Sequence, residues 1–463
     1  MFGRKPKWNL DRLKTCLTEA EGAILKGRGP SADSIAALRE LSSVPDTLLA
    51  RAHEESGRVA GHVMLALLRR GKIHWNQVDA LLAATEGGKD ASLSRDMLAY
   101  LQTANQIAER MLSRGLHKVN APDIAGSADD LKALIEAAMQ RHPEARSLNI
   151  LLGGVVSLTD REAARDLFRR ATRGGRNAMA TSIFDEGAHT YMNRVEVEAG
   201  SDRIVIDGLP AAIRAALNDR PAAYAAPEVE LLFSVDVGFL EIYGPNWFSL
   251  APYLMGEGQG LVMGVIGEPD RVAAVIAESR EMIVRLARFH RLPDPEGYAR
   301  AFAFVPITPP AGVGELKTLY ACSRYLMAAP LLEASGRPVL LLDADYSVRD
   351  PIQPYIKVLK SGRVGVSPSV GLGALWPWRR HMAGIGWFTP TEDARRFLGH
   401  VSDYVGAGLA LSPSWTLDQN ALTYAVEMTH DVELLNVRLA ENPFAQDRIR
   451  TVFEKAWRAR IVT

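Results

Sequence analysis

The sequence predicts an α/β domain in its C-terminal part and an all-α domain before it. In the first part of the chain, apolar residues recur at the spacing of amphipathic helices. Farther along, short apolar runs alternate with helical patterns, as in domains that are built on a mostly parallel sheet. We therefore expect a helical domain, with a repeat-like array as one arrangement, over residues 1–185, a hairpin and linker over 186–227, and the α/β domain over 228–463.

The composition is that of a folded protein. The chain has 463 residues, 47% of them hydrophobic, which is enough for two or three domains. Its 54 basic residues balance its 54 acidic ones, which argues against nucleic acid as a partner, because duplex binding needs a basic surface. The two cysteines, Cys16 and Cys322, form no disulfide or zinc pattern, which favours a reducing compartment. No signal peptide and no apolar stretch of roughly 20 residues is visible, so we expect a cytoplasmic protein without a membrane span.

Two helices of the first domain have recognisable ends. Ser127 stands at a helix start, apolar residues follow it at helical spacing, and Pro143 ends the pattern. Thr159 and Glu162 form a second start signal, and glycines at 174 and 175 end that helix. After the helical domain, residues 194–198 and 203–207 alternate apolar and polar side chains, which predicts a β-hairpin. The stretch 221–227, rich in alanine and proline, is expected to be a linker.

Five short apolar runs predict the strands of the α/β domain. They span residues 229–237, 261–267, 301–307, 338–345 and 363–366. An amphipathic helical pattern lies between the second run and the third. Parallel sheets bind ligands at the carboxyl ends of their strands, so we look for functional residues there.

The fourth run delivers two carboxylates, Asp343 and Asp345, to the end of a buried strand. Two negative charges so close together need a positive group beside them. A divalent cation that bridges to a diphosphate meets this need, because carboxylate and phosphate oxygens suit Mg²⁺ or Mn²⁺. The alternative is structural, with Asp343 capping the element that follows the strand.

With its strand, this motif resembles the DxD motif of GT-A-class nucleotide-sugar glycosyltransferases, in which it holds the metal. The resemblance covers residues 228–463. It implies a GT-A-like domain, Mn²⁺ or Mg²⁺ as cofactor, and a nucleotide-diphosphate sugar as donor. Residues 232–236 are similar to the family's first strand, which implies that Ser234 and Asp236 contact the nucleotide. By the same resemblance, the backbone at Ala344 approaches the ribose of the nucleotide.

Two further segments carry the resemblance. Residues 316–326, LKTLYACSRYL, are similar to the helix before the DxD strand, which presents an arginine, here Arg324, to the donor. Residues 415–422 match the W-x-x-DQ-x-AL pattern of retaining members. This match implies that Asp418 faces the donor sugar and that Gln419 lies beside it. Each residue also has a structural alternative: Asp236 in a turn, Arg324 as a solvated helix charge, and Asp418 in the first turn of a helix.

Two positions depart from the family pattern. No histidine follows His430 to serve as a third metal ligand, and Met382 stands where the family has the asparagine of an Asn-Ala-Gly segment. Between the DxD and DQ segments, a loop over 371–381 combines glycines, two tryptophans and two arginines. We expect it to form either a lid or acceptor wall, or an ordinary loop anchored by its tryptophans.

Two other functions compete with sugar transfer. Residues 343–348 are also similar to the nucleophile motif of haloacid-dehalogenase-type phosphatases, although Ser347 replaces Thr or Val and that motif normally opens its domain. Alternatively, the protein is a non-catalytic scaffold with a transferase-like half. In the preferred hypothesis the helical half recruits the acceptor, for which a protein is one candidate. The sequence does not identify the sugar, the base, the acceptor, the stereochemical outcome or the oligomeric state.

Overall fold

The computed structural model describes residues 91–173, 187–199, 203–411 and 416–446, together with 9, 11, 12, 15 and 414. The described residues fall into two compact units. The first extends to His189 and includes Val370–Trp376, and the second holds Thr190–Ser369 and the residues from Pro377 onward. The expectations for residues 1–90, Cys16 among them, concern residues outside the described ranges, apart from the few single positions named above.

The first unit is made of helices in its described residues. α5 lies against α7 and α8, and α8 packs on both α7 and α9. Ser127 is the N-cap residue of α7, as predicted. The start of α9 is one residue later than predicted, because the side chain of Asp160, not Thr159, accepts the hydrogen bond from the backbone N–H of Ala163 at 2.9 Å. The helices are α5 Ala91–Ser113, η2 Leu116–Lys118, α6 Ala121–Ala125, α7 Ala128–Arg141, α8 Leu148–Val156 and α9 Arg161–Thr172.

The loop over residues 371–381 was expected to form either a lid or acceptor wall, or a loop anchored by its tryptophans. Its first part is a buried segment of the first unit. Gly371–Leu375 forms the 3-10 helix η4, which packs on α5 and α6. Gly371 has a φ of 59°, and a Cβ there would lie 2.5 Å from the carbonyl oxygen of His117, so the position requires glycine. The two tryptophans of the loop, Trp376 and Trp378, are also buried. An acceptor wall with tryptophan faces presented to a sugar is therefore wrong, and the loop is a structural one.

The predicted hairpin is wrong, because residues 194–199 are helical. α10 (Gly187–Thr190) and α11 (Arg194–Ala199) occupy this region. Asn193 and Glu196 exchange hydrogen bonds between side chain and backbone, each 2.9 Å long, and these bonds fix the start of α11. In a strand, Val195 and Val197 would lie on the same face. Here Val197 is buried whereas Val195 is 65% exposed, as a helix allows.

The predicted linker is part of the α/β unit. α12 (Leu209–Asn218) packs against the sheet, and η3 (Ala222–Tyr224) leads into the first strand. The Arg220 guanidinium, which follows α12, binds both carboxylate oxygens of Glu230 at 2.6 and 2.8 Å. Both side chains are 1% exposed. This buried, bidentate ion pair ties α12 to the sheet.

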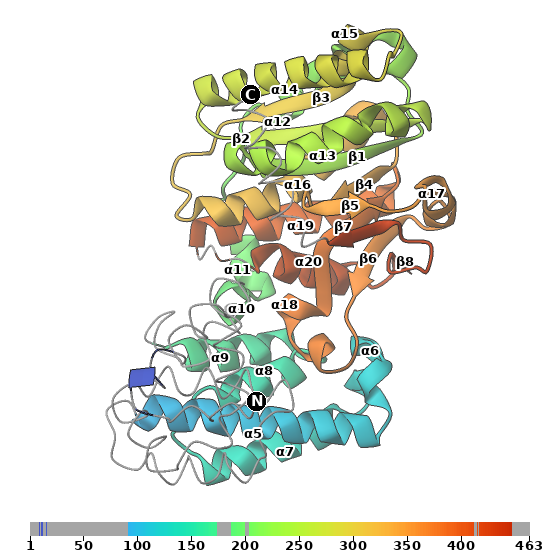
Figure 1. Ribbon diagram of the computed structural model, residues 1–463. Helices are drawn as coiled ribbons and strands as arrows, with labels where there is room; N and C mark the ends of the chain where they lie inside the picture. The colour runs from blue at the N-terminus through green and yellow to red at the C-terminus, as the bar shows by residue number, and fades with distance from the viewer. Residues whose placement is uncertain are drawn as a thin grey trace, which may run out of the picture. The chain divides into compact units, whose positions relative to one another are not determined.

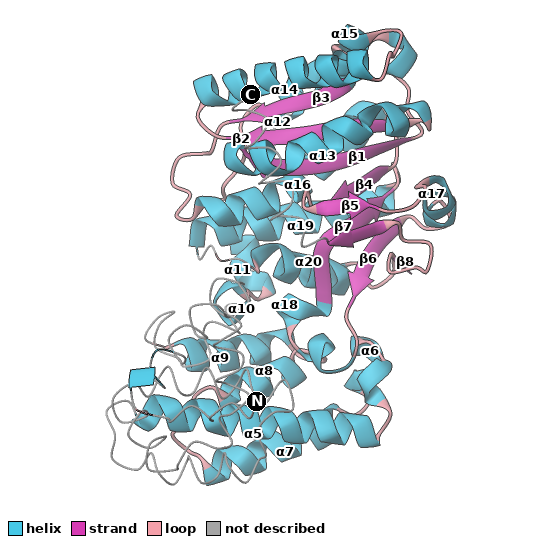
Figure 2. Cartoon of the chain, viewed as in Figure 1, coloured by secondary structure: helices cyan, strands magenta, loops and turns pink. Residues whose placement is uncertain are grey.

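The second unit is built on a seven-stranded mixed sheet with the order β3-β2-β1-β4-β7-β6-β8 (Figure 2). β1 to β4 are parallel, and β7 is antiparallel to both of its neighbours, β4 and β6. β5 and β9 pair in a separate antiparallel ribbon. The strands are β1 Val229–Asp236, β2 Gln259–Ile266, β3 Phe302–Ile307, β4 Val339–Leu342, β5 Tyr346–Val348, β6 Val364–Pro368, β7 His381–Phe388, β8 Leu434–Asn436 and β9 Phe444–Gln446.

Helices cover both faces of this sheet (Figure 1). Alternate residues of the buried strand β1 face opposite layers, as strand geometry requires. Phe233 packs in the cluster with α13 and α14, whereas Leu232 packs in the cluster with α16, α19 and α20. The α/β architecture predicted for this part of the chain is thus present. The remaining helices are α13 Val237–Gly256, α14 Pro269–Phe289, α15 Pro295–Ala301, α16 Leu316–Ser335, α17 Gln353–Leu359, α18 Pro377–Arg380, α19 Glu392–Leu411 and α20 Leu417–Met428.

Candidate active site

Four of the predicted site residues lie at the carboxyl ends of β1 and β4, where the order in which the chain adds strands to the sheet reverses. From β1 the chain builds β2 and β3 on one side, and then crosses to β4 on the other side of β1. The carboxyl ends of β1 and β4 therefore lie next to each other at one edge. Open α/β sheets bind ligands at such a switch point. Ser234 and Asp236 lie at the end of β1, and Asp343 and Asp345 follow β4.

At the end of β1, the side chains of Ser234 and Asp236 differ in their hydrogen bonding. Ser234 lies on the same face as Leu232, toward α16, and its buried Oγ has no hydrogen-bond partner in the described part of the chain. In the first turn of α16, the hydroxyl of Thr318 is likewise buried without a partner among the described residues. Asp236 caps α13 by accepting a hydrogen bond from the N–H of Phe239 at 2.9 Å. Asp236 thus has a structural role as the N-cap of a helix, whereas the structural alternative expected from the sequence was a turn residue.

The turn after β4 is held by its backbone. The N–H of Asp343 donates to the carbonyl oxygen of Gly384 in β7 at 2.9 Å. The indole N–H of Trp247, a fully buried residue of α13, donates to the carbonyl oxygen of Ala344 at 2.9 Å. The carboxylates on either side of Ala344 remain accessible, since the Asp343 side chain is 26% exposed and Asp345 is half-buried. Neither carboxylate is enclosed in the core.

Arg324 lies between two of the predicted carboxylates. Its Nη1 contacts Oδ1 of Asp343 at 2.9 Å, and its Nη2 contacts Oδ2 of Asp418 at 3.1 Å. Nη2 also donates to the carbonyl oxygen of Ala383 at 3.2 Å. The Arg324 side chain is only 8% exposed, so the alternative of a solvated helix charge is wrong. The structure thus brings together three residues that the sequence placed on three different elements.

The electrostatics of this group are governed by burial. Burial lowers the pKa of Arg324, but Asp343 and Asp418 raise it more, so the guanidinium stays charged. For Asp418, desolvation outweighs the attraction of Arg324, and Asp343 adds repulsion, so the pKa of Asp418 rises to about 6. Ionisation of Asp418 is therefore unfavourable in this buried position, even beside Arg324.

Asp418 and Gln419 lie in the first turn of α20, which begins at Leu417, so Asp418 has the helix position expected as its structural alternative. Asp418 is 4% exposed, and its Oδ1 accepts a hydrogen bond from the N–H of Gln419 at 2.8 Å. Gln419 is half-buried. Trp415, the first residue of the matched segment, lies outside the described residues.

Sequence reasoning missed several residues of this edge. A Cβ on Gly384 would lie 2.7 Å from the Tyr346 hydroxyl and 2.9 Å from Oδ2 of Asp343, so these groups pack directly on the glycine backbone. Burial, together with the charges of Asp343 and Asp345, raises the pKa of Tyr346 to about 12, and the charge of Arg438 opposes this rise. Only the fold brings Trp247 and Arg438 to this end of the sheet, and no sequence motif marks them, whereas Tyr346 directly follows Asp345 in the sequence.

The residues present would suit a cation that brings its own anionic ligands. Within the described ranges, no group of three or more His, Cys, Asp or Glu side chains is arranged as a metal site. Asp343, Asp345, Asp418 and Arg324 together carry three negative charges and one positive charge when ionised. Mg²⁺ is commonly bound by one or two carboxylates together with substrate phosphates, and this pair of carboxylates fits that pattern.

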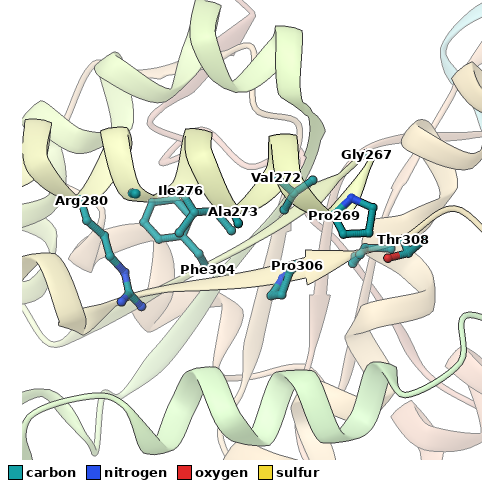
Figure 3. Close-up of a pocket in the computed structure, with 11 residues that line it drawn as sticks. Gly267, Pro269, Val272, Ala273, Ile276, Arg280, Phe304, Pro306 and Thr308 are labelled. Carbon is teal, nitrogen blue, oxygen red and sulfur yellow. The ribbon is translucent and has the colours of Figure 1, made fainter.

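A cavity of about 450 Å³ lies elsewhere in the unit, between the edge strand β3 and α14 (Figure 3). Apolar side chains line most of it, with Arg280 at one end and Thr308 at the other. Arg280 is ion-paired with Asp219 at 2.9 Å. Because no carboxylate lines this cavity, it does not suit a metal-bound diphosphate.

Comparisons with models of known protein families, with curated proteins and with solved structures found no match to this chain. Among the described helices, none is long and apolar enough to cross a membrane.

Proposed function

We propose that the α/β unit is a metal-dependent glycosyltransferase with a GT-A-like fold, which uses a nucleotide-diphosphate sugar as donor. The observation that carries this proposal is the position of Asp343 and Asp345. They follow a fully buried parallel strand at the switch point of the sheet, with their side chains partly exposed. Two carboxylates at this edge attract a divalent cation, and a cation attracts a diphosphate. The acceptor, for which a protein remains a candidate, would be recruited by the helical unit.

In this proposal Asp343 and Asp345 would hold Mn²⁺ or Mg²⁺. Such an ion, when bound, neutralises the charge that develops on a leaving diphosphate. Arg324 orients Asp343 through their 2.9 Å contact. The buried hydroxyls of Ser234 and Thr318 are unused within the described structure, and they suit the polar groups of a nucleotide near the end of β1.

Asp418 is the residue proposed to face the donor sugar. Its carboxylate is oriented by Arg324 and by the N–H of Gln419. Because burial disfavours its negative charge, an approaching positive centre would relieve that strain. A sugar that develops oxocarbenium character would be stabilised more in the transition state than in the ground state.

Consumption of nucleotide sugars tests the function. The full-length protein is incubated with Mn²⁺ and a panel of nucleotide sugars, and release of the nucleoside diphosphate is followed by chromatography. We expect one donor to be consumed, and we expect EDTA or the Asp345→Asn substitution to lower the rate at least 100-fold. A matched control, Glu278→Ala/Glu281→Ala, removes two exposed acidic residues from α14 and should leave the rate unchanged.

Adding a simple phosphomonoester to the substrate panel distinguishes the competing functions. A phosphatase of the haloacid-dehalogenase type would release phosphate from simple phosphomonoesters without any nucleotide. A non-catalytic scaffold would consume no donor under any condition. Either result would overturn the proposed function.

A further inference from the structure

A second cation lies at the same edge of the sheet as the acidic turn. Arg438 follows β8, and its Nε donates to the hydroxyl of Ser367, near the carboxyl end of β6, at 2.6 Å. Its backbone N–H donates to the side chain of Asn436 at 2.9 Å. These two bonds fix the base and the orientation of the guanidinium. The residue is exposed, and its two terminal nitrogens have no partner in the described part of the chain.

The strand order explains why Arg438 and the acidic turn share this edge. β6 and β8 are parallel to each other, and β7 runs antiparallel between β6 and β4, so the carboxyl ends of β4, β6 and β8 point the same way. Three strand spacings, about 14 Å, separate the backbones of β4 and β8. Oδ2 of Asp343 and the hydroxyl of Tyr346 both pack on Gly384 in β7, the strand that lies between β4 and β6.

The two arginines near the acidic turn, Arg324 and Arg438, differ in their ion pairs. Arg324 is ion-paired with Asp343, whereas Arg438, beyond β7 and β6 in the sheet, forms no ion pair in the described structure. An anion placed between the acidic turn and Arg438 would have a cation on both sides, provided that a metal sits on the turn. The fork of terminal N–H groups on an arginine matches the oxygens of a phosphate.

We propose that Arg438 is the residue that binds the diphosphate of the donor from the side opposite the metal, and that Ser367 is its positioning residue. This inference rests on the proposed function, because it takes the ligand of Asp343 and Asp345 to be a metal-bound diphosphate. It assigns Arg438 a role in recognising charge on the phosphates, and none in recognising the nucleoside.

Isothermal titration calorimetry on the full-length protein tests the proposal. The ligands are UDP, GDP and ADP, the matching nucleosides, and inorganic pyrophosphate, each in the presence of Mn²⁺. We expect Arg438→Gln to weaken binding of the preferred nucleoside diphosphate and of pyrophosphate by about 10- to 100-fold, the value of a charge-assisted hydrogen bond, and to leave nucleoside binding unchanged. Ser367→Ala should weaken diphosphate binding less, and Arg438→Lys should restore part of the loss.

The control is Arg363→Gln, which removes another exposed arginine, ion-paired with Asp393 beside the start of β6, at the opposite end of the strands. Its diphosphate affinity should equal that of the wild type. Unchanged pyrophosphate affinity in Arg438→Gln, or an equal loss for nucleoside and diphosphate, would overturn the inference. If the wild type binds pyrophosphate through Arg438 but consumes no nucleotide sugar, the role of Arg438 in binding a diphosphate stands, and sugar transfer from a nucleotide-sugar donor is overturned. If the wild type binds neither pyrophosphate nor any nucleoside diphosphate, both fail.

Discussion

Replacing Asp418 by asparagine should stabilise the protein at neutral pH while it abolishes sugar transfer. In the folded chain the pKa of Asp418 rises to about 6, because burial disfavours the carboxylate more than Arg324 favours it; the ordinary value is 3.8. A difference of one in pKa corresponds to about 1.36 kcal/mol, so keeping Asp418 ionised costs the fold about 3 kcal/mol. Asparagine keeps the shape of the side chain without the charge.

The sign of the pH dependence follows from the raised pKa. Between pH 3.8 and about 6 the folded chain binds the proton of Asp418 more tightly than the unfolded chain does. The wild type therefore gains stability from this group as the pH falls through 6, and it loses that gain as the pH rises. The advantage of Asp418→Asn over the wild type should be about 3 kcal/mol at pH 8, about half of that at pH 5, and absent below about pH 3.

Urea unfolding of the two proteins, followed by circular dichroism in metal-free buffer with EDTA, measures this difference. Other titrating groups cancel in the comparison. The control is Asp431→Asn, which removes an exposed carboxylate that is ion-paired with Arg396 at 2.7 Å, and this substitution should change the stability little. If Asp418→Asn were less stable than the wild type at pH 8, the ion pair with Arg324 would outweigh burial, and the assignment of Asp418 as a strained functional residue would be wrong.

Three other substitutions test the packing and hydrogen bonding of the α/β unit. Gly260→Ala would place a Cβ 2.1 Å from Oε2 of Glu230, and breaking the buried ion pair of that residue should cost about 3–5 kcal/mol in urea unfolding. Gly399→Ala, on the exposed face of α19 with nothing within 4 Å of its Cβ, should instead raise the stability by about 0.5–1 kcal/mol. Trp247→Phe removes the hydrogen bond to the carbonyl of Ala344, so it should cost about 1 kcal/mol and weaken Mn²⁺-dependent nucleotide binding; equal affinity would show that this bond does not position the turn.

The strands that could be predicted from the sequence are those buried on both faces. β1 reads as one apolar run because each of its residues up to Val235 is buried, and its observed end differs from the predicted one by a single residue. β7 is not among the predicted strands, since its antiparallel pairing and the irregular register with β6 leave no simple pattern. The hairpin prediction was wrong for a different reason. It relied on two segments with alternating side chains and overlooked Asn193 and Glu196, whose reciprocal hydrogen bonds stabilise the start of a helix.

For the candidate site, the sequence predicted the positions of single residues but not the contacts between them. Local patterns placed Asp343, Arg324 and Asp418 at the ends of a strand and on two helices. That one guanidinium bridges the two carboxylates depends on how α16 and α20 pack on the sheet, and the motifs carry no such information. Arg438, which we propose as a diphosphate ligand, and Trp247 could not be predicted, because each is positioned by a hydrogen bond to a residue distant in sequence.

Binding of Mn²⁺, measured by electron paramagnetic resonance with and without a nucleoside diphosphate, tests the central claim most directly. Asp343 and Asp345 form an incomplete metal site without phosphate oxygens, so we expect weak binding of Mn²⁺ alone and at least 10-fold tighter binding once the preferred nucleoside diphosphate is present. The Asp343→Asn/Asp345→Asn variant should lose this enhancement while retaining its circular dichroism spectrum. If no nucleoside diphosphate tightened Mn²⁺ binding to the wild type, or if the folded double variant bound Mn²⁺ and nucleotide equally well, the acidic turn after β4 would not be the metal site.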